Sequence, residues 1–179
     1  MSKNYKVYAL LLNHQRCSPV NPFGKKLYPM PLSLILLLVT LSIVLIVVLI
    51  HYETLRLLST YLPKLSIQPR LRILIVIYGT FCAHLLEIAL FGVGYYLFGH
   101  CLNLGTLHGI KHISFLDYMY FSIITYTSLG FGDIYPIGYI RLLTGIEGLI
   151  GLLMIGWTAS FTYLMMEKLW LDHRQPRKK

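Results

Sequence analysis

Long runs of apolar residues dominate the chain after a polar N-terminal segment. The first run, residues 31–51, contains no Lys, Arg, Asp or Glu. At about 1.5 Å per residue it extends roughly 30 Å as a helix, the thickness of a bilayer's hydrocarbon core. Residues 73–99 and 139–166 are also long enough to cross, whereas residues 114–127 extend only about 20 Å and are not. The pattern therefore predicts an all-α membrane protein with three transmembrane helices and one short helix.

These runs divide the chain into five segments. They are a polar, basic N-terminal segment at residues 1–30, an additional N-terminal transmembrane helix at 31–51, a basic cytoplasmic or interfacial linker at 52–72, a helical module at 73–166 and a basic cytoplasmic tail at 167–179. Within the module, we expect an outer helix at 73–99, a solvated outer loop at 100–113, the short helix at 114–127, an irregular segment at 128–133 and an inner helix at 139–166.

Composition and charge narrow the classes of protein. With 56% hydrophobic and 13% charged residues, the chain is not a soluble enzyme, and its three cysteines are too few for a disulfide framework or a cysteine-rich zinc site. The net charge of +9 could indicate nucleic-acid binding. However, most of the Lys and Arg residues flank the hydrophobic runs, as is typical of cytoplasmic segments beside anionic lipid. The expected partner is the lipid bilayer, and no nucleic acid is expected.

The short helix is followed by a glycine-rich segment. Ser114 and Asp117 have the spacing of a helix start, and non-helical backbone at membrane depth must be enclosed by protein or line a wet cavity. Consecutive carbonyl groups point the same way when the backbone alternates between ordinary and positive-φ conformations. Gly130 and Gly132 can adopt the positive φ without strain. A ring of such carbonyls replaces the hydration shell of a cation, and the C-terminal dipole of the short helix favours a cation there.

The sequence Ser128-Leu129-Gly130-Phe131-Gly132-Asp133, followed by Tyr135-Pro136, resembles the signature of the tetrameric potassium channels, commonly Thr-Val-Gly-Tyr-Gly-Asp. Residues 73–166 are similar to the two-helix pore module of that superfamily, with residues 114–127 as pore helix and 128–133 as selectivity filter. The additional N-terminal helix is similar to that of a group of small bacterial ion-channel proteins.

The resemblance implies a homotetrameric, multi-pass protein of the cell (inner) membrane that conducts K⁺ passively. It implies no enzyme activity and no cofactor besides the permeant K⁺, and no metal site other than the filter is expected. The implied ion ligands are the hydroxyl of Ser128 and the carbonyls of Ser128, Leu129, Gly130 and Phe131. The residues expected to support the filter are Thr127, Gly132, Asp133, Tyr120 and Tyr126.

Several positions depart from the usual signature. Ser128 replaces Thr, Leu129 replaces Val, and Phe131 replaces Tyr and so lacks the phenolic hydroxyl that braces the filter. We expect Tyr120, Phe121 and Tyr126 to brace it by packing instead. Because Ile124 stands where some relatives carry a glutamate, no carboxyl partner is expected for Asp133. These departures leave the sharpness of K⁺ selectivity open, and a weakly selective Na⁺/K⁺ channel remains an alternative.

Two groups of residues have competing interpretations. Gly148 and Gly151 of the inner helix are either a gating hinge or small residues at a close helix contact. His84, Glu87 and Glu147 are ionisable residues inside predicted transmembrane helices, a class that is often functional. We expect them to form one buried network that joins the outer and inner helices. The alternative is a proton or cation sensor, for which activity would change with pH.

Two further functions remain open from different classes. Gly130-Phe131-Gly132-Asp133 also matches the G-x-G-D motif of intramembrane aspartyl proteases, for which Asp117 is the available second aspartate. A non-conducting subunit of a larger channel is the other alternative, and any gating partner is unknown. In the outer loop, His108 and His112 have the one-turn spacing of a metal pair on a helix, but nearby glycines favour a solvated loop.

The positive-inside rule gives conflicting orientations for the two ends of the chain. If the short helix enters the membrane from outside, residues 52–72 and the tail are cytoplasmic, as their charge predicts. The N-terminus is then outside, together with five Lys and Arg residues that precede residue 27. Either the requirement of the short helix overrides these charges, or residues 31–50 do not cross the membrane, or translation starts at Met30. We expect the last, and the intact mass of protein expressed from the native gene tests it.

Overall fold

The computed structural model describes residues 30–102, 104–110 and 112–174. The expectations for the segment before Met30 and for the last five residues of the tail lie outside the described residues. The chain divides into two compact units, Met1–Ser33 and Leu34–Lys179, and the arrangement below is that of the second unit.

Three long helices contain the predicted spans. They are α2 (Met30–Tyr61), α3 (Pro69–Tyr96) and α5 (Ile140–Arg174). By length and composition they can cross a membrane over Leu34–Lys64, Arg70–Gly99 and Ile140–Lys168. Their outer surfaces are apolar and exposed, for example Leu45 at 60% and Tyr78 at 68%. Such exposure suits contact with lipid better than contact with water.

Two helices are longer than the sequence analysis predicted. The linker expected from residue 52 is still helix until Tyr61, and a 3₁₀ turn, η1 (Leu62–Lys64), follows. The helix persists because Pro63 is the first residue that breaks it, and Leu55 remains buried on its inner side. Similarly, α5 extends past residue 166 to Arg174, since no glycine or proline interrupts the sequence between Gly156 and Pro176.

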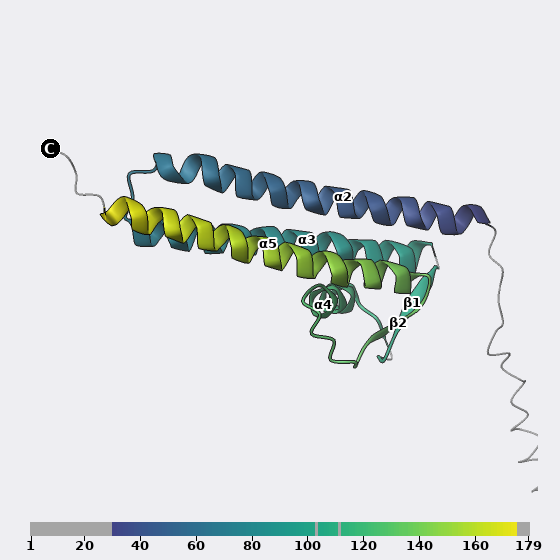
Figure 1. The fold of residues 1–179 in the computed structure, drawn as a ribbon. Helices are drawn as coiled ribbons and strands as arrows, with labels where there is room; N and C mark the ends of the chain where they lie inside the picture. The colour runs from purple at the N-terminus through teal and green to yellow at the C-terminus, as the bar shows by residue number, and fades with distance from the viewer. Residues whose placement is uncertain (1–29, 103, 111, 175–179) are drawn as a thin grey trace, which may run out of the picture. The chain divides into compact units, whose positions relative to one another are not determined.

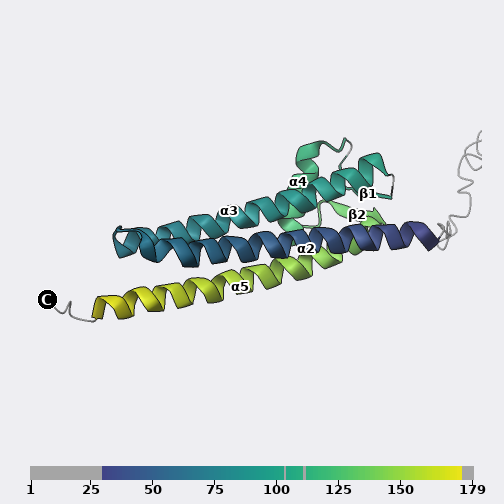
Figure 2. The same ribbon diagram turned by 90° about the horizontal axis from the view of Figure 1, so that it is seen from above.

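The short helix α4 (Phe115–Tyr126) lies across α3 and α5 instead of running along them (Figures 1 and 2). The core where the three helices meet consists of fully buried, mostly apolar side chains. They are Phe91 and Tyr95 from α3, Tyr126 from α4, and Ile140 and Leu143 from α5. The helix α2 lies beside α3, where Leu58 packs against Gly79.

The outer loop expected at residues 100–113 contains regular structure. A π-helical turn, η2 (Leu97–Cys101), continues α3, and strand β1 (Gly105–His108) follows. It pairs antiparallel with β2 (Tyr135–Gly138), so that His108 lies opposite Tyr135 and Gly105 opposite Gly138. This two-stranded sheet was not predicted, because four-residue strands lack a period-2 signal of their own. It ties the end of α3 to the start of α5 (Figure 1).

Candidate functional site

The start of α4 is fixed by the side chains that the sequence predicted. The Asp117 carboxylate accepts hydrogen bonds from both the backbone N–H and the hydroxyl of Ser114, each at 2.7 Å. These bonds satisfy a backbone donor that the first helical turn leaves unpaired. They also lower the pKa of Asp117 below its ordinary value. The predicted helix start is therefore confirmed.

The end of α4 turns its backbone donors back onto the helix. The N–H of Ser128 donates to the Thr125 carbonyl at 2.9 Å, and the N–H groups of Leu129 and Gly130 both donate to the Ile124 carbonyl, at 3.0 and 3.2 Å. The donors of this turn are thus satisfied locally. The carbonyl groups that follow α4 are left to project from it.

The segment 128–133 alternates between the two signs of φ. Ser128, Gly130 and Gly132 have φ values of 55°, 53° and 81°. The positive φ of the two glycines was expected, whereas that of Ser128 was not predicted. A left-handed conformation costs about 1–2 kcal/mol at a residue with a Cβ, so Ser128 is a strained position. Continuing the alternation backwards by two residues from Gly130 would have identified it.

This segment is not enclosed by the rest of the chain. Leu129 and Phe131 are 60% and 65% exposed, and a Cβ added at Gly130 or Gly132 would have no described neighbour within 4 Å. In Figure 1 the chain between α4 and β2 forms a loop that stands away from the long helices. One chain therefore supplies only part of the surroundings that this backbone needs at membrane depth.

Tyr120 braces the segment through its hydroxyl, whereas packing had been expected. The Tyr120 hydroxyl donates to Asp133 Oδ2 at 2.9 Å, and this bond raises the pKa of Tyr120. Asp133 therefore has a phenol as its partner. The carboxylates of Asp117 and Asp133 bond to different groups, Ser114 and Tyr120, so this geometry is unlike the shared-proton dyad of an aspartyl protease.

Tyr126 does not pack against the filter segment as expected. Its side chain is buried, and its hydroxyl donates to Glu87 Oε2 of α3. It therefore holds the last turn of α4 against α3. The Thr127 hydroxyl, also expected to support the filter, donates to the Ile123 carbonyl at 2.8 Å, so it closes the end of the helix.

Glu147 lies in a buried group that joins α3, α4 and α5. Its carboxylate accepts a hydrogen bond from the Tyr95 hydroxyl at 2.5 Å, and the Ser122 hydroxyl lies 2.5 Å from its other oxygen. The Tyr95 hydroxyl also lies 3.2 Å from Thr144 Oγ1. Glu147, Tyr95 and Ser122 are all excluded from solvent. The group fixes the middle of α4 between the two long helices.

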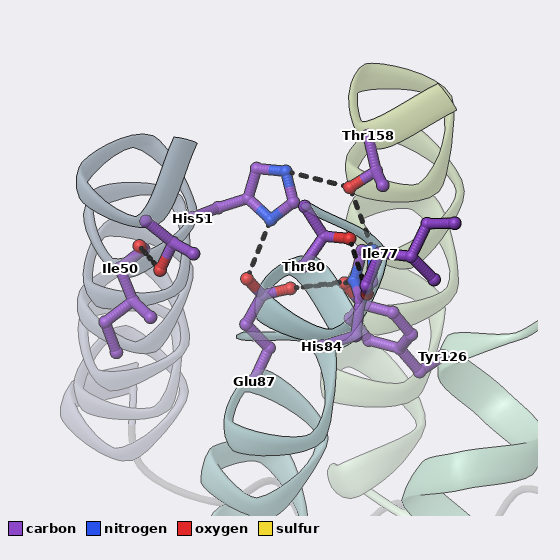
Figure 3. A network of polar contacts seen from close by, with 9 residues as sticks. Ile50, His51, Ile77, Thr80, His84, Glu87, Tyr126 and Thr158 are labelled. Atoms are coloured by element: carbon purple, nitrogen blue, oxygen red, sulfur yellow. Dashed lines mark hydrogen bonds and ion pairs between the residues drawn. The ribbon is translucent and has the colours of Figure 1, made fainter. Parts of the chain in front are cut away.

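Glu87 lies in a second buried group, together with His51, His84, Tyr126 and Thr158 (Figure 3). His84 Nδ1 lies 3.4 Å from Glu87 Oε2, as their spacing on one helix face predicts. The expectation of one network over His84, Glu87 and Glu147 is corrected, because the two carboxylates bond to separate sets of residues: Glu147 to Tyr95 and Ser122, and Glu87 to His51, His84 and Tyr126. His51 was not predicted as a member of this group, although an imidazole at the end of an otherwise apolar run could have identified it.

The glycines of α5 lie against α4. A Cβ on Gly151 would overlap the carbonyl of Tyr126, and one on Gly148 would lie 3.6 Å from the Thr125 carbonyl oxygen. The helix is continuous across both positions. Close contact with the end of α4 therefore accounts for Gly151 without a hinge.

Comparison with known proteins gives one family. A family model described as an ion channel matches residues 73–168, just over half of the chain. The match begins in α3, includes α4 and the segment 128–133, and ends in α5. No curated protein and no solved structure matches the chain.

Proposed function

The chain belongs to the ion-channel family whose model it matches over residues 73–168, and from this premise we propose that it is a homotetrameric channel for passive K⁺ conduction. The match and the three apolar helices confirm the predicted all-α, multi-pass membrane fold. Members of a channel family assemble as oligomers in a membrane. We propose the cell membrane as the location and four as the number of subunits.

The observation that carries the proposal is the alternation of φ through Ser128, Gly130 and Gly132. Alternate positive φ turns successive carbonyl groups toward one side of the backbone, and a column of carbonyl oxygens can replace the water around a dehydrated cation. The hydroxyl of Ser128 supplies a further oxygen. Thus the proposed ligands are the carbonyls of residues 128 to 131 and the Ser128 hydroxyl, with K⁺ as the permeant ion.

The exposure of this segment supports a tetramer. A single chain leaves the carbonyl column open on one side, so other copies must complete the ring of oxygens around an ion. The inner helix also has unpartnered apolar residues, such as Leu149 and Leu152 at 61% and 62% exposed. Four copies around one axis would cover these residues and enclose the filter.

The bond from Tyr120 to Asp133 supports selectivity for K⁺ over Na⁺. It ties the outer end of the filter segment to its own α4 and so opposes collapse of the oxygen ring around a smaller ion. Phe131, which lacks a hydroxyl, favours the second candidate, a weakly selective Na⁺/K⁺ channel. The ratio of K⁺ to Na⁺ permeability distinguishes the two.

The test is ion flux into liposomes that contain the purified full-length chain. We expect K⁺ flux that exceeds Na⁺ flux and is blocked by Ba²⁺, and a tetrameric mass in native mass spectrometry. Comparable Na⁺ and K⁺ fluxes would identify the weakly selective channel. No flux from a correctly folded tetramer would contradict conduction and favour a non-conducting subunit. Cleavage of membrane peptides that Asp117→Ala abolishes would instead identify a protease.

Gly130→Ala is the decisive variant. Alanine at φ 53° would be strained by about 1–2 kcal/mol, so we expect flux to fall to background while expression and assembly persist. The matched control is Gly156→Ala, which makes the same change in α5 where no described atom lies within 4 Å of the added Cβ. If both variants conduct equally, the carbonyl column is not the conduction path.

A further inference from the structure

A buried group of two histidines and a glutamate joins α2 to the helices of the family-matched module. His51 comes from α2, His84 and Glu87 from α3, and Thr158 from α5 (Figure 3). The side chains of His51 and Glu87 are 0% exposed and that of His84 is 16% exposed. This group, which we call the His51 cluster together with Tyr126, has no part in the proposed conduction path.

The hydrogen-bond partners determine where the imidazole protons lie. A carboxylate only accepts, so His51 Nδ1, 2.9 Å from Glu87 Oε1, must carry a hydrogen. The single hydroxyl hydrogen of Tyr126 is donated to Glu87. His84 Nδ1 lies 2.9 Å from the Tyr126 oxygen, so it must also carry its hydrogen and donate. Both neutral imidazoles are therefore protonated at Nδ1.

This assignment leaves the cluster one donor short. The unprotonated Nε2 atoms of His51 and His84 both face Thr158 Oγ1, at 3.3 and 3.0 Å. A threonine hydroxyl has one hydrogen and satisfies one of these two acceptors. The other buried nitrogen faces an oxygen lone pair, which is unfavourable away from water. The bare, neutral cluster is incomplete, and a bound cation would complete it.

We infer that the His51 cluster is a binding site for a divalent transition-metal ion of the Zn²⁺ class. His51, His84 and Glu87 each offer one ligand atom, and these atoms all lie within 4.8 Å of one another. The ion would be held by the Glu87 carboxylate and by the two Nδ1 atoms, which lie next to it. His51 Nδ1 lies 2.9 Å from Oε1 of Glu87, and His84 Nδ1 lies 3.4 Å from its Oε2. Both distances are close to the roughly 3.3 Å between ligands of a tetrahedral ion with bonds of about 2.0–2.1 Å.

Metal binding also supplies the missing donor. When each Nδ1 binds the ion, its hydrogen is exchanged to Nε2, so no proton is lost from the neutral imidazoles. Both Nε2–H groups then donate to the two lone pairs of Thr158 Oγ1. Ligating histidines usually donate their second N–H in this way. Tyr126 continues to donate to Glu87, so both imidazoles and the carboxylate have partners.

The ligand types favour particular metals. Two imidazoles and one carboxylate suit Zn²⁺, Co²⁺ or Ni²⁺, whereas Mg²⁺ and Ca²⁺ prefer oxygen ligands alone. The Trp157 ring lies 5.3 Å from that of His51 and gives the site an apolar wall. A bound ion would connect α2 directly to α3, next to the residue that anchors the last turn of α4. The inference does not depend on which ion the channel conducts.

The experiment is a titration of the full-length chain with Co²⁺ after its metals have been removed by a chelator. We expect one Co²⁺ per chain, an intense visible ligand-field spectrum typical of four-coordinate Co²⁺, and stoichiometric displacement by Zn²⁺. This arm uses the unaltered protein, so it cannot fail through misfolding of a variant. A weak spectrum of the hydrated ion, or no binding, would overturn the inference.

Variants locate the site. His51→Ala, His84→Ala and Glu87→Gln should each abolish the spectrum, and Thr158→Val should weaken affinity about 10- to 100-fold. The matched control is His112→Ala, which removes an exposed histidine of the outer loop and should change nothing. Binding that survives His51→Ala and is lost with His112→Ala would overturn the inference. Stabilisation by acid alone, without metal binding, would assign the missing donor to a proton and also overturn it.

Discussion

The contact between Gly151 and the end of α4 allows a quantitative test of how α5 positions the filter. Gly151→Ala would place a Cβ where the carbonyl of Tyr126 lies, and the nearest atoms are backbone atoms that cannot rotate away. In a helix, replacing glycine with alanine by itself stabilises by about 0.8–1 kcal/mol. Forcing an extra carbon into a packed contact destabilises by about 1–3 kcal/mol.

The matched control separates these two effects. Gly156→Ala makes the same change in the same helix, where nothing described lies within 4 Å of the added Cβ. It should therefore show the propensity gain alone. The difference between the two variants isolates the overlap, and we expect Gly151→Ala to be about 1–3 kcal/mol less stable than Gly156→Ala.

The assay compares denaturant unfolding of the two purified variants in the same detergent and K⁺ flux in liposomes. We expect Gly151→Ala to lower both the unfolding midpoint and the flux, because moving Tyr126 displaces the backbone that leads into the filter. Equal stability of the two variants would refute the packing argument. Equal stability with altered open probability would instead identify Gly151 as a hinge.

Two other predictions concern the ends of α4. Tyr120→Phe removes the 2.9 Å hydrogen bond to Asp133 and should raise the permeability of Na⁺ relative to K⁺. The control Tyr78→Phe changes a side chain that is 68% exposed and should leave this permeability ratio unchanged. Equal ratios in the two variants would refute the bracing role of Tyr120. Ser114→Ala should raise the pKa of Asp117 toward its ordinary value, measured by NMR titration, because the donors that lower it are reduced. In the wild-type protein, the stability that these hydrogen bonds contribute is fully present above the ordinary carboxyl pKa. It is lost as the pH falls through the lowered pKa of Asp117. An unchanged pKa of Asp117 in the variant would contradict this prediction.

The two buried carboxylates have complementary effects on α4. Glu147 holds its middle through Ser122, and Glu87 holds its last turn through Tyr126. Because a buried carboxylate without its donors is strongly unfavourable, these bonds fix the axial position and the rotation of α4. The placement of residues 128–133, which directly follow α4, depends on both.

The sequence determined the elements that depend on local pattern. Apolar runs long enough for a bilayer predicted the three long helices, Ser114 and Asp117 predicted where α4 begins, and the spacing of Gly130 and Gly132 predicted their positive φ. Each of these features depends on residues within a few positions of one another. For that reason, length, capping and glycine spacing were sufficient to identify them.

The tertiary structure decided which distant residues meet. His51 contacts Glu87 across 36 positions of sequence, Glu147 bonds to Tyr95 and Ser122 instead of joining Glu87, and β1 pairs with β2. Each short element or single polar side chain has several alternative partners of the same chemistry along the chain. Only the packing of α2, α3, α4 and α5 brings one of those partners within hydrogen-bond distance and excludes water from the resulting contact.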